Sequence, residues 1–166
     1  MISYIVTGGR GALGGAVVET LCALGHQVAI IDRGVEAPRA GAALVVGEVD
    51  LADPAKVEAA FARVAAELGG VDGLANIAGG FLWQTVAKGG LDGWDAMYQT
   101  NLRTVAVTCR AVVPHLSDGG AIVNVGAASA ARPGAGLAAY AASKAGVMAL
   151  TMSLAEELRA RRVRVT

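Results

Sequence analysis

Apolar residues along the chain fall into short runs that alternate with longer stretches of helical spacing. The short runs predict strands at residues 2–7, 27–32, 43–46, 71–75 and 121–125, with the start of another at 163–165. The longer stretches predict helices at residues 13–24, 54–68, 92–116 and 138–161. Alternating strands and helices are typical of βαβ units, so the pattern predicts an α/β fold with a doubly wound parallel sheet and helices on both faces.

Length and composition narrow the class of protein. The 166 residues predict a single domain over residues 1–166. A hydrophobic content of 54% with 17% charged residues excludes a disordered chain, and a formal net charge of zero disfavours a nucleic-acid partner. No apolar run is long enough to span a membrane, and the N-terminus lacks the basic region of a signal peptide. Cys22 and Cys109 are expected to be reduced, and the default location is cytoplasmic.

A glycine-rich turn joins the first predicted strand to the first predicted helix. It reads Thr-Gly-Gly-Arg-Gly-Ala-Leu-Gly over residues 7–14. Glycine lets the backbone approach a phosphate, and the amides of a helix N-terminus favour bound anions. Any tight strand–helix turn can also use glycine. The position of this one favours a dinucleotide site.

Asp32 ends the second predicted strand, close to the offset of about 20 residues at which a carboxylate contacts the adenosine ribose. It could equally be a turn residue at the end of a strand. Arg10 and Arg33 favour the opposite cofactor, because either could meet a 2′-phosphate. We therefore expect NAD, with NADP as the alternative.

Tyr140 and Lys144 are four residues apart, so a helix places them on one face. A nearby ammonium favours the ionised form of a phenol, which would let a tyrosine act as an acid or base near neutral pH. A surface Tyr–Lys pair on a helix is the alternative interpretation. The small, apolar residues around this pair favour the catalytic one.

Taken together, these features resemble the short-chain dehydrogenase/reductase family along residues 6–166. The family's Thr-Gly-x-x-x-Gly-x-Gly turn matches Thr7, Gly8 and Gly14, with Ala12 in place of the middle glycine. Four further family motifs match in order: an Asp at the adenine pocket (Asp50), Asn-Asn-Ala-Gly as Asn76-Ile77-Ala78-Gly79, an active-site Asn (Asn101) and the Tyr-x-x-x-Lys pair (Tyr140, Lys144).

The resemblance implies a Rossmann-type domain with strand order 3-2-1-4-5 and a partial sixth strand, which binds the cofactor where the strand order reverses. With the residues considered above, the expected cofactor contacts are Thr7, Gly8, Arg10, Ala12, Leu13, Gly14, Asp32, Arg33, Asp50, Leu51, Asn76, Ala78, Gly79, Tyr140 and Lys144. It also implies catalytic roles. Tyr140 would exchange a proton with the substrate oxygen, Lys144 would hold the nicotinamide ribose, and Asn101 would support a water at a local break in its helix.

Two departures from the family pattern stand out. Ala127 occupies the position of the family's substrate-orienting Ser. Either Ser129, two residues further on, supplies that hydrogen-bond donor, or the hydrogen bond is missing. The string over residues 78–81 beside this gap is similar to the dihydropteridine-reductase-like branch. Family members also continue past this point, so we expect residues 1–166 to lack the C-terminal strands and the substrate loop.

The expected activity is NAD(P)-dependent interconversion of an alcohol and a carbonyl by a homodimer or homotetramer. The rival is a nucleotide-binding or scaffold protein without turnover, for which Ala127 and the missing C-terminal part argue. His26 and His115 have no second ligand at metal spacing, so no metal site is expected. Trp83 and Trp94 flank the region where a substrate would lie, although packing is the favoured role for both.

Overall fold

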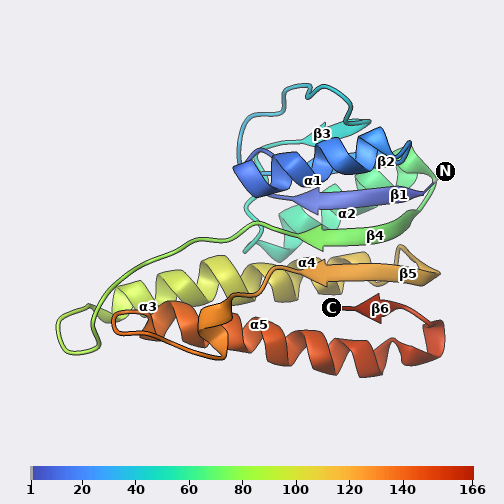
Figure 1. Cartoon of the computed structure of the whole chain (residues 1–166). Helices are drawn as coiled ribbons and strands as arrows, with labels where there is room; N and C mark the ends of the chain where they lie inside the picture. Colours follow the sequence, from blue (N-terminus) through green and yellow to red (C-terminus); the bar gives the residue numbers. More distant parts are fainter. Residues whose placement is uncertain (1) are drawn as a thin grey trace.

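A six-stranded parallel sheet forms the centre of the computed structural model, which describes residues 2–166. The strand order is β3-β2-β1-β4-β5-β6, and every pair of neighbours is parallel. The strands are β1 (Ser3–Thr7), β2 (Gln27–Ile31), β3 (Leu44–Val46), β4 (Val71–Asn76), β5 (Leu116–Asn124) and β6 (Arg164–Val165). The predicted doubly wound fold and strand order are confirmed (Figure 1).

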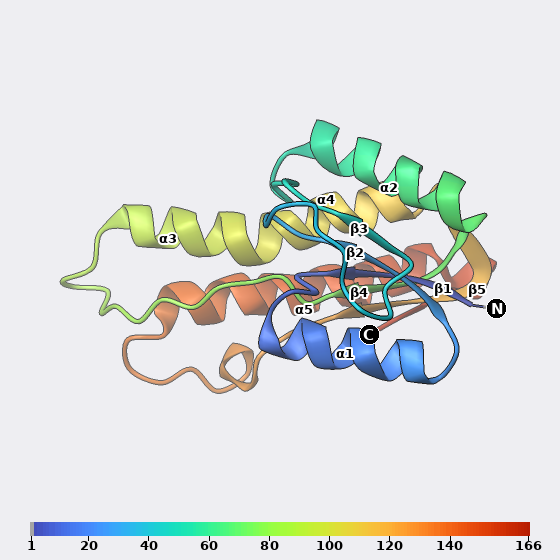
Figure 2. The ribbon, with the colours of Figure 1, turned by 90° about the horizontal axis from the view of Figure 1, so that it is seen from above.

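Helices cover the sheet on both sides (Figure 2). Helix α1 (Ala12–Ala23) lies on one face, and α2 (Pro54–Leu68) and α4 (Thr104–Val112) lie on the other. Helix α5 (Ala138–Glu157) packs along β5 and β6. Successive side chains of β1 point to opposite faces of the sheet, so both faces have a core. Ile5 and the next residue, Val6, are fully buried in separate core clusters.

Local sequence sets the ends of α2 as predicted. Asp53 is the N-cap, and its carboxylate accepts hydrogen bonds from the amides of Ala55 (3.0 Å) and Lys56 (3.3 Å). Pro54 occupies the first turn, where a missing amide hydrogen has no consequence. Gly69 ends the helix in the left-handed conformation, with a φ of 76°.

The helix predicted over residues 92–116 is wrong in two respects. It consists of α3 (Leu91–Met97), a π-helical segment η1 (Tyr98–Arg103) and α4, which stops at Val112. Pro114 cannot continue a helix, and β5 begins at Leu116 rather than at residue 121. Helix α5 likewise ends at Glu157 instead of 161, where the 3-10 turn η3 (Arg159–Arg161) leads to the left-handed residue Arg162.

Candidate functional site

A cleft of about 640 Å³ opens at the carboxyl ends of the central strands, where the strand order reverses. The lining includes ten of the residues predicted to contact a cofactor: Gly8, Ala12, Leu13, Gly14, Asp32, Arg33, Asp50, Leu51, Ala78 and Gly79. It also includes Gly11 and Ile77, which lie inside the predicted motifs without having been named as contacts. Sequence reasoning missed four further lining residues: Ala52, Gln99, Thr100 and Thr104. The last three come from η1 and α4, and no local motif marks them.

The turn between β1 and α1 fits a dinucleotide because two of its positions, Gly8 and Gly14, have no room for a side chain. Gly8 has a φ of 68°, and a Cβ added there would lie 2.9 Å from the backbone of Ala78. A Cβ on Gly14 would overlap the carbonyl oxygen of Gly8. Gly11 caps α1 without a side-chain hydrogen bond, so no side chain competes for the amides of the first turn. This cradle matches the chemistry of a pyrophosphate.

Asp32 connects the glycine-rich turn to the loop after β2. Its carboxylate accepts hydrogen bonds from the amides of Arg10 (3.2 Å) and Gly34 (3.1 Å). The Arg10 side chain does not line the cleft, because its guanidinium donates to the carbonyl of Ala37 (2.9 Å). Of the two arginines that could meet a 2′-phosphate, the structure therefore places only Arg33 in the lining.

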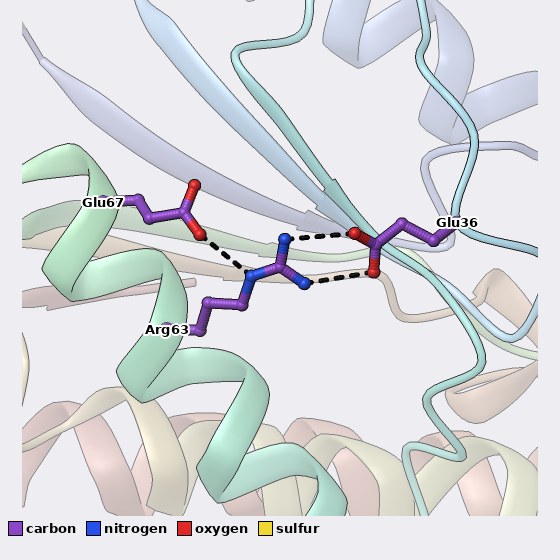
Figure 3. Close-up of polar contacts among 3 residues, drawn as sticks. All are labelled: Glu36, Arg63 and Glu67. Atoms are coloured by element: carbon purple, nitrogen blue, oxygen red, sulfur yellow. Dashed lines mark hydrogen bonds and ion pairs between the residues drawn. The ribbon is translucent and has the colours of Figure 1, made fainter.

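The β2–β3 loop, residues 32–43, is fastened to helices on both sides of the cleft. Arg39 donates to the carbonyl of Gly9 (3.0 Å) near α1. Glu36 forms a two-pronged pair with Arg63 of α2 (3.0 and 3.1 Å), which Glu67 supports from the same helix (2.9 Å), as Figure 3 shows. Hydrogen bonding to Arg63 holds the pKa of Glu36 below its usual value.

Tyr140, Lys144, Asn101 and Ser143 form what we call the reaction corner. Lys144 is buried, and its ammonium donates to the carbonyl of Val125 (2.7 Å). Burial lowers the pKa of this ammonium. Both Lys144 and Asn101 lie against Gly79, since a Cβ there would come within 3.5 Å of the Lys144 Nζ and 3.0 Å of the Asn101 Oδ1. Gly79 thus separates the reaction corner from the cleft.

Asn101 lies in η1, the local break in the helix that the resemblance implied. It is fully buried, and its Oδ1 accepts from the amide of Gly80 (2.8 Å). Its Nδ2 donates to the carbonyl of Gly80 (3.1 Å) and to the hydroxyl of Ser143 (3.0 Å). The side chain therefore ties the loop after β4 to α5. Sequence reasoning missed Ser143, which lies one residue before Lys144.

Thr7 and Asn76, both predicted to contact the cofactor, have side chains that do not line the cleft. They belong to a buried network in which the Asn76 Oδ1 accepts from Thr108 (2.8 Å) and the Asn76 Nδ2 donates to Asn124 (2.8 Å). Asn124 continues it by donating to Thr151 of α5 (2.9 Å). The network links the strands under the cleft to the helix that carries the reaction corner.

Ser129 lies in the short 3-10 turn η2 (Ala128–Ala130) that follows β5. Its Oγ is buried, and it has no hydrogen-bond partner among residues 2–166. A buried hydroxyl normally has a partner, so an unsatisfied one calls for an explanation. This is the residue that sequence reasoning placed as a possible substitute for the serine missing at Ala127.

Within residues 2–166, no three His, Cys, Asp or Glu side chains come together as a metal site. None of the helices described combines the length and apolar character that a bilayer crossing requires. Burial raises the pKa of the Cys109 thiol to about 12, which keeps it protonated and unreactive at neutral pH.

Known proteins share this fold and this sequence pattern. Residues 3–166 match the short chain dehydrogenase family. Carbonyl reductase family member 4 of Danio rerio is 33% identical over 168 residues, which are 97% of this chain and 71% of that protein.

Two solved structures are similar along 99% of the chain. A short-chain dehydrogenase/reductase from Serratia marcescens has a TM-score of 0.89 and 32% identity, and the match covers 75% of it. A short chain dehydrogenase from Burkholderia cenocepacia in complex with NADP has a TM-score of 0.86 and 36% identity, and the match covers 71% of it. The chain thus spans 71 to 75% of the length of these three proteins.

Proposed function

The chain belongs to the short-chain dehydrogenase/reductase family, whose cofactors are NAD and NADP, and we propose that it interconverts an alcohol and a carbonyl. One observation carries the proposal: Gly79 lines the cofactor cleft on one side and touches Lys144 and Asn101 of the reaction corner on the other. A nicotinamide held in this cleft supplies the hydride chemistry.

Several parts of the chain would hold the cofactor. The glycine-rich turn and the first amides of α1 suit the pyrophosphate, and Asp32 suits the adenosine ribose hydroxyls. A carboxylate at this position repels a 2′-phosphate, so we propose NAD as the preferred form. Arg33 is the residue in the lining that would favour NADP.

Tyr140 would donate the proton to the substrate oxygen during reduction and accept it during oxidation. Lys144, one helical turn further along, would contact the nicotinamide ribose and supply positive charge beside the phenol. Ser129, whose hydroxyl has no partner among residues 2–166, would orient the substrate oxygen after a rearrangement of η2 that exposes its buried Oγ. Asn101 would keep these groups in register by fixing Gly80 against α5.

A homodimer or homotetramer is also part of the proposal. Helix α5 exposes Met148 (47%) and Met152 (59%), and η1 exposes Tyr98 (48%). Large apolar side chains on the outside of packed helices suit burial against a second copy. Sedimentation analysis of the chain with and without Met152→Lys would test this assembly.

The direct test is a titration of the chain with NADH and NADPH, followed by nicotinamide fluorescence. We expect tighter binding of NADH, together with carbonyl reduction that Tyr140→Phe lowers by about 10²–10⁴-fold while cofactor affinity is retained. Cofactor binding without turnover in the unsubstituted chain would favour the rival, a nucleotide-binding protein without catalysis. The observation behind that rival is Ala127 at the position of the usual serine.

A further inference from the structure

Two aromatic side chains of the loop after β4 are exposed, and one of them contacts Tyr140. Phe81 is 62% exposed and Trp83 is 60% exposed, and both come from the loop between β4 and α3. The Phe81 ring meets the Tyr140 ring edge to face, with centroids 5.0 Å apart and an angle of 75°. Apolar area of this kind, left in water next to a reactive hydroxyl, gains free energy when a bound apolar group covers it.

Trp83 packs against the loop that leads into α5. Its indole lies directly over Gly136, where an added Cβ would overlap the ring. The amide of Gln84 donates to the carbonyl of Gly136 (2.9 Å), which joins the loop after β4 to the loop that enters α5. Figure 1 shows both loops, green and orange, extending beyond the same end of the sheet. The two aromatic residues therefore come from a loop that is fastened just before the helix that carries Tyr140.

The two loops provide little for a polar substrate. Residues 77–90 and 126–137 contain no carboxylate, and their charged residues are Lys88 and Arg132. The residues after β5 are small: Gly126, Ala127, Ala128, Ser129, Ala130 and Ala131. Recognition of a polyol or a phosphate ester requires several placed donors, acceptors and cations. The exposed side chains that the structure places against Tyr140 and Gly136, those of Phe81 and Trp83, are instead apolar.

We propose that Phe81 and Trp83 form the wall on which an apolar substituent of the substrate packs. The substrate class is then ketones or aldehydes with an aryl, cyclic or branched alkyl group, and the corresponding alcohols. This inference rests on the proposed function, because it takes Tyr140 as the group that meets the reacting oxygen. During reduction the carbonyl carbon gains a hydride from the reduced nicotinamide and its oxygen gains the Tyr140 proton. The C=O bond becomes a single bond as the cofactor is oxidised, and Tyr140 regains a proton from water.

The test compares cyclohexanone with dihydroxyacetone, which are apolar and polar ketones, in the full chain with NADH. We expect a higher kcat/KM for cyclohexanone, and we expect Phe81→Ala to lower the ratio of the two kcat/KM values by about tenfold. Phe81→Leu should restore part of that ratio. Leu24→Ala is the matched control, because Leu24 is also an exposed apolar residue (66%) but lies between α1 and the start of β2, at the opposite end of the strands from Phe81.

Other outcomes separate this inference from the proposed function. Turnover with a preference for dihydroxyacetone, or an unchanged ratio in Phe81→Ala, would overturn the apolar wall and leave the oxidoreductase activity standing. If neither ketone is reduced, the proposed function fails. Saturation-transfer NMR then tests the apolar wall separately, by measuring whether cyclohexanone binds to the chain. Binding that is lost in Phe81→Ala supports it. No binding, or a Phe81-dependent dimer in its place, overturns it.

Discussion

The cofactor cleft and the reaction corner are formed by different kinds of chemical groups. Much of the cleft consists of backbone and small side chains, with the carboxylates of Asp32 and Asp50 in its lining. The reaction corner consists of polar side chains held by other parts of the chain: Asn101 is fully buried, and Lys144 is only 5% exposed. A substitution that adds a side chain to a glycine of the cleft would change its shape. A substitution that removes a polar group from the reaction corner would instead leave its hydrogen-bond partners unsatisfied.

This difference predicts how the two regions respond to substitution. Changes in the cleft should act on cofactor affinity, because its residues determine which molecule fits. Changes in the reaction corner should act on the rate of the chemical step if its residues hold and move a proton, as we propose. A substitution at Gly79, which lines the cleft and also contacts the reaction corner, should therefore change both cofactor affinity and the rate.

Replacement of Lys144 by Met should give the largest effect. The substitution keeps the apolar stem and removes the charge that we propose acts on Tyr140, so kcat should fall by about 10³-fold. NADH affinity should also fall, because the proposed contact of Lys144 with the nicotinamide ribose is lost, but by less than kcat, because the cleft keeps its other contacts with the cofactor. Stopped-flow turnover and fluorescence titration measure the two quantities. Lys56→Met, at an exposed position of α2, is the control for loss of a lysine. A loss of affinity as large as the loss of rate would remove the distinction between the two regions.

The same lysine predicts a pH dependence. Burial lowers the pKa of Lys144 below 10.5, so its charge is lost at a lower pH than that of an exposed lysine. Activity in the alkaline range should therefore fall as the pH rises through this lowered value. The stability effect has the opposite sign: between the lowered pKa and 10.5 the unfolded chain binds more protons, so the contribution of Lys144 to stability rises with pH. Urea unfolding of the chain and of Lys144→Met across this range would show the trend, and a constant difference between them would contradict it.

Replacement of Gly14 by Ala should act on the cleft. The added Cβ would overlap the carbonyl oxygen of Gly8, so the turn must open and its amides must shift. A displacement of about 1 Å can reduce activity by roughly 10²-fold, and we expect a loss of NADH affinity of that order. Gly134→Ala is the matched control, because a Cβ there meets only Leu137, at an ordinary 3.7 Å. A melting curve would separate a local change from global unfolding, and unchanged affinity in a folded variant would refute the cradle.

These two regions also differ in how far the sequence predicts them. The glycine-rich turn of the cleft follows from residues that are close in the chain, since the constraint on Gly14 comes from Gly8 itself. The spacing of Tyr140 and Lys144 is local in the same way. The hydrogen bond from Asn101 to Ser143 joins residues 42 positions apart, and no periodicity reports it. Apolar spacing could not reveal the π-helical turn either, because that turn is defined by its backbone hydrogen bonds.

Replacement of Asp32 by Asn should change the choice of cofactor by about tenfold. Loss of the negative charge removes repulsion of a 2′-phosphate, so the ratio of the NADPH and NADH dissociation constants should shift toward NADPH. Arg10 and Gly34 donate to different oxygens of Asp32, so the amide oxygen of asparagine keeps one of these two bonds, which limits damage to the turn. Asp50→Asn serves as the control, since that carboxylate also lines the cleft. An equal shift in the control would mean that the cleft's total charge, and not Asp32, sets the preference.

Replacement of Arg63 by Met should give the smallest effect. Arg63 does not line the cleft, but its pair with Glu36 fastens the loop that carries Arg33 to α2. Exposed pairs contribute about 0–1 kcal/mol, so we expect a rise in the KM for NADH of about threefold with little change in kcat. High salt should weaken the pair and reproduce part of this rise in the unsubstituted chain. Arg110→Met breaks a comparable exposed pair with Glu58 that does not involve the loop. If both variants change the KM for NADH equally, the Glu36–Arg63 pair does not contribute to the shape of the cleft, which then depends on the strand ends and the glycine-rich turn.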